Sequence, residues 1–337
     1  MHKRITTAIL LLAALMAVII WLRRDPPRYL RIAGAAQGTS YSVIWESTDG
    51  TNLKPQIESL LQELDRSLST YASDSLINRV NANDPDVLPD GHLLEVLQQA
   101  IQAHQDTGGA FDPTIAPVVR ASGFGPDAAD AVLDQAIQDA MPLVGLDKVS
   151  IVDGRIIKER PGTTFDLNGI AQGYSADVIA RFLTSTGSKN FMVEIGGEVV
   201  ARGVNADGHD WRVGIDRPSE GNLFPGTHLE AILTLHDRAL ATSGNYRSFH
   251  EIDGRKYTHC IDPRTGQSTD SPLLSVTVTA PTCTLADAYA TAYMVMGLEQ
   301  SIVFIASRPD LEALFIHADE SGALQTHSTP GLTMIDP

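Results

Sequence analysis

The segment VSIVDGRIIK, residues 149–158, decides the class of fold. It holds two short apolar runs on either side of Asp153-Gly154, and Asp-Gly is a dipeptide that closes two-residue β-hairpins. The same arrangement recurs around Asp253-Gly254, between the runs 249–252 and 256–260. Hairpins join antiparallel strands, so we expect the sheets of this protein to be largely antiparallel.

Helices and further strands surround these two hairpins. Apolar residues at helical spacing predict helices over 53–68, 93–101, 128–141, 169–184 and 284–296. Apolar and β-branched runs predict strands at 29–33, 40–46, 191–195, 198–201, 211–216 and 274–280. The elements come in mixed runs without regular βαβ alternation, which favours an α+β fold. No linker-like segment divides residues 28–337, so they are expected to form one body.

Composition excludes several classes of protein. The chain has 337 residues, of which 43% are hydrophobic and 20% charged, as in a globular protein. The net charge of −16 argues against nucleic-acid binding, which relies on clustered Lys and Arg. A phosphorylated small ligand is compatible with this charge if a divalent cation or backbone amides offset its phosphates.

Residues 1–27 are predicted to be a membrane anchor or signal segment. No charged residue occurs from Ile5 to Leu22, a length close to the ~20 apolar residues that cross a bilayer. The run ends in Ile19, Ile20, Trp21 and Leu22, not in the small residues of a cleavage site, which favours an uncleaved anchor over a cleaved signal peptide. Either interpretation places the body outside the cytoplasm, and the favoured anchor places it at the inner membrane, facing the periplasm.

The two cysteines, Cys260 and Cys283, do not have the spacing of a metal site. Zinc and iron–sulfur chemistry are therefore not expected. The sequence leaves open whether the two residues pair in a disulfide.

Two polar segments interrupt the first half of the body. GAFDPT (109–114) is a tight turn with an aromatic ring and a carboxylate. DLNGIAQGY (166–174) runs from a strand end into a helix, whose free N-terminal amides suit a phosphate. Ordinary capping by Asp166 or Asn168 explains the second segment equally well.

Two further segments lie near the C-terminal end. HCIDPRTG (259–266) places His259 in a turn beside Asp, Arg and Thr, where a histidine can serve acid–base chemistry. In DAYAT (287–291), the i, i+4 spacing puts Asp287 and Thr291 on one helix face. Carboxylate, hydroxyl and main-chain oxygens are the hard ligands that Mg²⁺ accepts.

Together and in this order, these segments resemble the ApbE family of FAD:protein FMN transferases. The resemblance extends from about Gln37 to Gly297. It also includes GTSY (38–41), STY (69–71), EIGGE (194–198), WRVGID (211–216) and ATSGNY (241–246).

The resemblance implies an α+β body of two intertwined parts with an FAD cleft between them. It implies Mg²⁺ ligands at Asp287 and Thr291, with main-chain oxygens near Gly169 and Ala290, and it makes His259 the candidate base. The implied FAD-binding residues are Gln37, Tyr71, Ala110, Phe111, Asp112, Asp166, Gln172 and Ile261. Gln37 stands where the family often has Met, and Gln172 where it often has Lys or Glu.

The activity implied by the resemblance is Mg²⁺-dependent transfer of FMN from FAD to a threonine hydroxyl of an acceptor protein, with release of AMP. The acceptors of the family are typically flavin-bearing subunits of membrane electron-transport complexes. Two alternatives remain open at this point. A Mg²⁺-dependent FAD pyrophosphatase would use water in place of threonine, and a non-catalytic FAD-binding protein would need neither the base nor the metal.

Overall fold

The computed structural model describes residues 28–47, 49–125, 134–219, 226–245, 249–252, 255–258, 260–269 and 271–335. The predicted membrane segment, residues 1–27, and the candidate base His259 lie outside the described residues.

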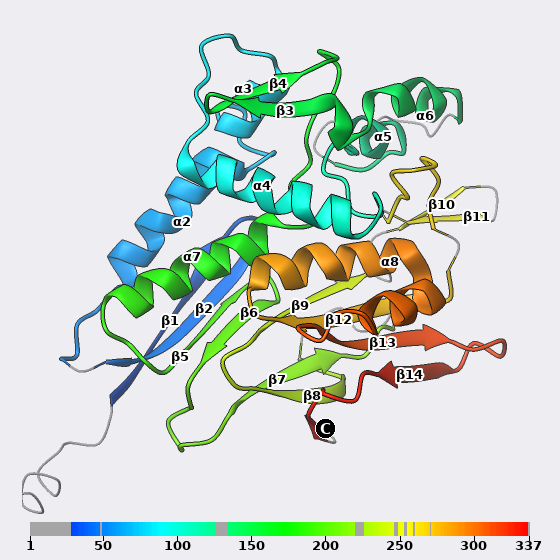
Figure 1. Ribbon diagram of the computed structural model, residues 1–337. Helices are drawn as coiled ribbons and strands as arrows, with labels where there is room; N and C mark the ends of the chain where they lie inside the picture. The colour runs from blue at the N-terminus through cyan, green and yellow to red at the C-terminus, as the bar shows by residue number, and fades with distance from the viewer. Residues whose placement is uncertain are drawn as a thin grey trace, which may run out of the picture.

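An eight-stranded sheet forms the centre of the molecule (Figure 1). In spatial order its strands are β1 (Arg28–Ala36), β2 (Thr39–Ser47), β5 (Phe191–Ile195), β6 (Glu198–Arg202), β9 (Ala239–Gly244), β12 (Leu273–Ala280), β13 (Glu312–Ala318) and β14 (Leu324–Ser328). Every neighbouring pair in this sheet is antiparallel. The predicted α+β fold with largely antiparallel sheets is confirmed.

Long helices cover one face of this sheet, and shorter ones lie beyond them (Figure 1). The long helices are α2 (Lys54–Leu68), α4 (Gly91–Asp106), α7 (Ala171–Ser185) and α8 (Cys283–Ile305). The short ones are α3 (Leu76–Asn81), α5 (Ala116–Ala121), α6 (Asp134–Ala140), η1 (Met141–Leu143) and η2 (Leu146–Lys148). The predicted helices over 53–68, 93–101 and 169–184 are confirmed. Of the one predicted over 128–141, residues 128–133 lie outside the described part of the chain, and α6 covers most of the remainder.

Alternation of side chains along the strands builds a core on each face of the sheet. In β5, Phe191, Val193 and Ile195 pack with α2 and α7, whereas Met192 packs on the opposite side. That side is covered by a three-stranded sheet in the order β15 (Met334–Ile335), β8 (Leu229–Leu235) and β7 (Trp211–Asp216). The period of two in strands therefore places the central sheet between two apolar layers.

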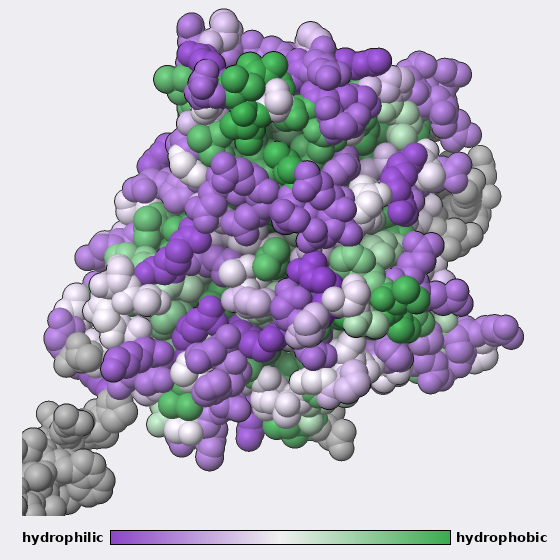
Figure 2. Space-filling model, in the orientation of Figure 1, coloured by the Kyte–Doolittle hydropathy of each residue, from purple (hydrophilic) through white to green (hydrophobic). Residues whose placement is uncertain are grey.

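Both predicted hairpins are present. β3 (Val149–Val152) pairs with β4 (Arg155–Lys158), and β10 (Phe249–Ile252) pairs with β11 (Arg255–Thr258). The β3–β4 end of the molecule exposes apolar side chains, and Figure 2 shows hydrophobic surface over α3, β3 and β4 at the top of the view.

The predicted helix over 284–296 is confirmed as the first part of α8, which breaks at Gly297, where φ is 75°, and continues as a second helical segment to Ile305. By length and composition it is the one helix in the described part of the chain that could cross a membrane. Its side chains instead pack against β9, β12 and α7, and Tyr289 and Tyr293 are fully buried. It is a core helix of this fold. Cys283 at its start and Cys260 are not joined in a disulfide.

Candidate active site

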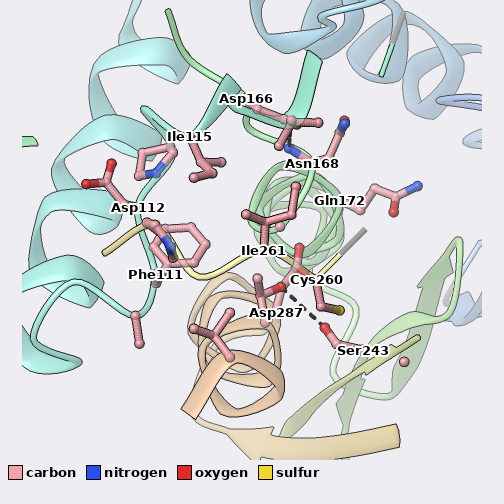
Figure 3. A pocket seen from close by; sticks show the side chains of 18 of the residues that line it. Phe111, Asp112, Ile115, Asp166, Asn168, Gln172, Ser243, Cys260, Ile261 and Asp287 are labelled. Carbon is pink, nitrogen blue, oxygen red and sulfur yellow. Dashed lines mark hydrogen bonds between the residues drawn. The ribbon is translucent and has the colours of Figure 1, made fainter. Parts of the chain in front are cut away.

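A cavity of about 360 Å³ opens where the N-terminal end of α7, α8 and the loop before α5 approach the sheet (Figure 3). Six of the eight expected FAD-binding residues line it, and so do three of the four expected metal ligands. The six are Ala110, Phe111, Asp112, Asp166, Gln172 and Ile261, and the three are Gly169, Asp287 and Thr291. Segments far apart in the sequence thus meet at one cavity.

The remaining three expected residues do not line the cavity. Ala290 is fully buried one residue before Thr291. Gln37, in the β1–β2 turn, has a φ of 53° and donates from Nε2 to Ser175 Oγ at 2.7 Å, which ties the turn to α7. Tyr71 follows α2 and is 67% exposed. Its neighbour Thr70 lines a smaller pocket together with Asp166, which also lines the cavity.

The GAFDPT turn is held by its own carboxylate. Asp112 Oδ1 accepts hydrogen bonds from the amide and hydroxyl of Thr114, and Oδ2 accepts from the amide of Leu146 at 3.2 Å. His104 Nδ1 lies 3.3 Å from Oδ2, and this hydrogen bond raises the pKa of His104 above its ordinary value although burial opposes the rise. Asp112 therefore fixes the loop that presents Ala110 and Phe111 to the cavity.

The DLNGIAQGY segment approaches α8 closely because it contains glycines. A Cβ at Gly169 would lie 2.9 Å from Thr291 Oγ1 and 3.3 Å from Phe111 Cε2. The N-cap residue of α7 is Ile170, whose side chain makes no capping hydrogen bond. The Asp166 carboxylate accepts from the amide of Asn168 in the preceding turn.

Asp287 and Thr291 lie on the cavity side of α8. Asp287 Oδ2 accepts from the amide of Gly173 at 3.0 Å, and Thr291 Oγ1 is 3.3 Å from Ser243 Oγ (Figure 3). Burial raises the pKa of Asp287 to about 7, the Gly173 amide lowers it, and the charge of Asp177 raises it again. The predicted pairing of these two oxygen groups on one helix face is confirmed.

Glu198 is a site residue to which sequence reasoning gave no role. It begins β6 directly after Gly196-Gly197, lines the cavity and is only 7% exposed. Burial, followed by the negative charge of Asp287, raises the pKa of its carboxyl well above the ordinary value. The one signal in the sequence is a carboxylate after a glycine pair between two strands, and that pattern alone does not indicate burial.

The charged side chains among the described residues that line the cavity are all acidic. Four of the described residues that line it are acidic: Asp112, Asp166, Glu198 and Asp287. Among those described lining residues there is no Lys, Arg or His. An anionic ligand in this cavity would need a bound cation or backbone amides to offset its charge, because no described side chain at the wall supplies positive charge.

Comparisons with known proteins identify the family of this chain. The ApbE family model matches residues 37–315. A relative from Vibrio cholerae serotype O1, named FAD:protein FMN transferase, is 35% identical over 306 residues, which covers 88% of this chain and 90% of the relative. The solved structure of flavin transferase ApbE from Vibrio cholerae superposes with a TM-score of 0.80 at 33% identity, covering 90% of this chain and 98% of that one. The apo form of Pseudomonas stutzeri flavinyl transferase ApbE superposes with a TM-score of 0.80 at 32% identity, and the match covers 90% of this chain and 95% of that one.

The fold is thus that of the flavin transferases. The chain belongs to the ApbE family, as its sequence predicted.

Proposed function

We propose that this protein transfers FMN from FAD to a threonine hydroxyl of an acceptor protein and uses Mg²⁺ at the Asp287 end of the cavity. Transfer of FMN from FAD to a protein is the activity for which its relatives are named, and the chain matches them over most of its length. Threonine as the acceptor residue and Mg²⁺ as the metal are the finer parts of the proposal.

The observation that carries the proposal is the acidic cavity. FAD holds its two halves together by a pyrophosphate, which is an anion, yet the described lining residues are acidic and include no basic side chain. A divalent cation reconciles the two, since it attracts both the carboxylates and the phosphates.

The residues present fit Mg²⁺. Asp287 supplies a carboxylate and Thr291 a hydroxyl, and the main chain passes the same point at Gly169. No group of three or more His, Cys, Asp or Glu side chains that could hold a metal occurs in the described residues. The remaining ligands would then be main-chain, phosphate or water oxygens, which is usual for Mg²⁺.

The reaction exchanges the phosphoanhydride bond of the FAD pyrophosphate for a phosphoester bond to threonine. The threonine oxygen attacks the FMN phosphorus in line, a new P–O bond forms, and the P–O bond to the AMP half breaks. Bound Mg²⁺ would neutralise pyrophosphate charge and stabilise AMP as it leaves. The hydroxyl proton needs a base, and we assign it to His259, because the next two residues, Cys260 and Ile261, line the cavity.

The test is mass spectrometry of a threonine-containing acceptor, taken from a membrane electron-transport subunit, after incubation with the full-length protein, FAD and MgCl₂. We expect the mass of the acceptor to rise by that of bound FMN, and the rise to require Mg²⁺. Free FMN and AMP without labelled acceptor would support a pyrophosphatase instead. FAD retained without turnover would support a binding protein.

A variant separates the base from the metal site. His259→Ala should bind FAD with nearly the wild-type dissociation constant but transfer no FMN, because only the proton acceptor is removed. Unchanged transfer by His259→Ala would remove the assignment of the base.

We also propose that residues 1–27 anchor the body to the inner membrane on its periplasmic side. The uncharged run from Ile5 to Leu22 supports this proposal. Intact cells with a permeabilised outer membrane should lose the body to added protease, and the protein should sediment with membranes. Protection of the body from protease would contradict the orientation.

A further inference from the structure

Glu198 lies at the base of the FAD cavity, in the middle of the large sheet. It is the first residue of β6, a strand with neighbours on both sides, and α8 packs over that strand. The turn before it contains Gly196 and Gly197, with φ of 68° and 110°. Its position is therefore fixed by a rigid sheet and a tight turn.

One oxygen of this carboxyl group is buried without a hydrogen-bond partner in the described structure. Glu198 Oε2 is inaccessible to solvent, and no described residue donates to it. Leaving a buried charged group unsatisfied is costly, so native proteins rarely do so without a proton or an ion nearby.

Asp177 is a neighbouring buried carboxylate, and its oxygens do have hydrogen-bond donors. Asp177 is 8% exposed, close to the 7% of Glu198. It accepts hydrogen bonds from the amides of Cys283 and Thr284 and from the hydroxyl of Thr284. The chain therefore supplies donors to one buried acid of this region but supplies none to Glu198 Oε2.

Nothing positive in the described wall of the cavity compensates Glu198. The charged side chains that act on it are acidic, Asp287 foremost and Glu194 after it. Asp287 lines the same cavity and uses Oδ2 for the Gly173 amide. Two buried carboxyl groups that face one cavity, with an oxygen of Glu198 unpartnered, are stabilised together by one divalent cation.

We propose that Glu198 is the second carboxylate of the cation site at Asp287 and raises its affinity for divalent metal. The inference rests on the metal site of the proposed function and adds Glu198 to it. The glycine pair before Glu198 allows the turn that brings the carboxylate to the cavity.

The test is titration of Mn²⁺ alone into the full-length, FAD-free protein, with bound metal followed by electron paramagnetic resonance and by calorimetry. Mn²⁺ is the probe because it takes the same oxygen ligands as Mg²⁺. Glu198→Gln keeps the shape of the side chain and removes its charge. We expect its dissociation constant to rise at least tenfold, which corresponds to ~1.4 kcal/mol.

Glu194→Gln is the matched control. Glu194 lies four residues earlier in the adjacent strand β5 and accepts from the amide of Gly197, so it has the partner that Glu198 Oε2 lacks. Its dissociation constant should stay within twofold of wild type. Thermal melts in EDTA should show Glu198→Gln to be at least as stable as wild type, because the variant removes an unpartnered buried charge.

Each outcome decides a separate point. If Asp287→Asn weakens Mn²⁺ binding and Glu198→Gln does not, the role of Glu198 is refuted and the metal site stands. If the wild type binds no Mn²⁺, both are refuted. Should Glu198→Gln not fold, Glu198→Asp replaces it, because it keeps the charge but withdraws it by one methylene. A wild-type dissociation constant for Glu198→Asp would then overturn the inference.

Discussion

Replacing Asp287 by Asn is expected to stabilise the metal-free protein and abolish its response to Mg²⁺. Burial is the main cause that moves the pKa of this carboxyl from its ordinary 3.8 to about 7. Each tenfold change in a protonation equilibrium corresponds to ~1.4 kcal/mol, so the ionised form lowers the free energy of unfolding by ~4 kcal/mol. Asn keeps an oxygen to accept from the Gly173 amide.

The sign of the pH dependence follows from the two pKa values. Between pH 3.8 and about 7 the unfolded chain has lost the Asp287 proton and the folded chain still holds it. The free energy of unfolding of the wild type therefore falls as pH rises through this window. The free energy of unfolding of Asp287→Asn does not fall in this way. The difference in free energy of unfolding between this variant and the wild type should be absent at pH 4 and largest at pH 8.

The assay is urea unfolding of both full-length proteins in EDTA at pH 4, 6 and 8, repeated at pH 8 with MgCl₂. Metal should raise the midpoint of the wild type but not that of Asp287→Asn, because a ligand stabilises only the state that binds it. Asp319→Asn is a control with the opposite expected effect. Hydrogen bonds from Ser321 and Gln325 lower the pKa of Asp319 to about 2, so its ionised form stabilises the folded state and the variant should be less stable than wild type. A metal-free Asp287→Asn protein that is less stable than wild type at pH 8 would refute the reasoning.

Three further predictions test other parts of the site. In Gly173→Ala, the new Cβ would lie 2.8 Å from Asp287 Cβ and against the Cys283 carbonyl, so α7 and α8 must separate; urea unfolding should show a loss of ~1–3 kcal/mol. Tyr71→Ala should leave the melting temperature unchanged, since the ring is 67% exposed, yet weaken FAD binding ~2- to 10-fold in a fluorescence titration if the ring stacks on FAD. His104 has a raised pKa in the folded state, so its stabilising contribution is complete below pH 6.5 and is lost as pH rises through the raised value. In unfolding curves measured between pH 6 and 8, His104→Gln should remove this fall of the free energy of unfolding with pH.

Local features of the fold were predictable from the sequence. The Asp-Gly pairs located both hairpins, and the helical spacing of apolar residues located α2, α4 and α7. Strands β8 and β9 were not predicted.

The candidate site was likewise predictable from the sequence only in part. Asp287 and Thr291 share a helix face through their spacing alone, so the sequence was sufficient to pair them. The order of the motifs was sufficient to indicate the family. Gln37 and Tyr71 were expected in the FAD-binding set, but they lie beside the cavity and not on its wall.

The sequence by itself determined the family, the antiparallel α+β fold and the residue types of the site, because these depend on local periodicity and on the identity of short segments. Only the tertiary structure decided that Gly169, Phe111 and Thr291 meet, and that Glu198 is buried in the same cavity as Asp287. Burial, hydrogen-bond satisfaction and pKa values depend on which distant elements pack together. No pattern in the sequence indicates that a buried carboxylate will lack a hydrogen-bond partner.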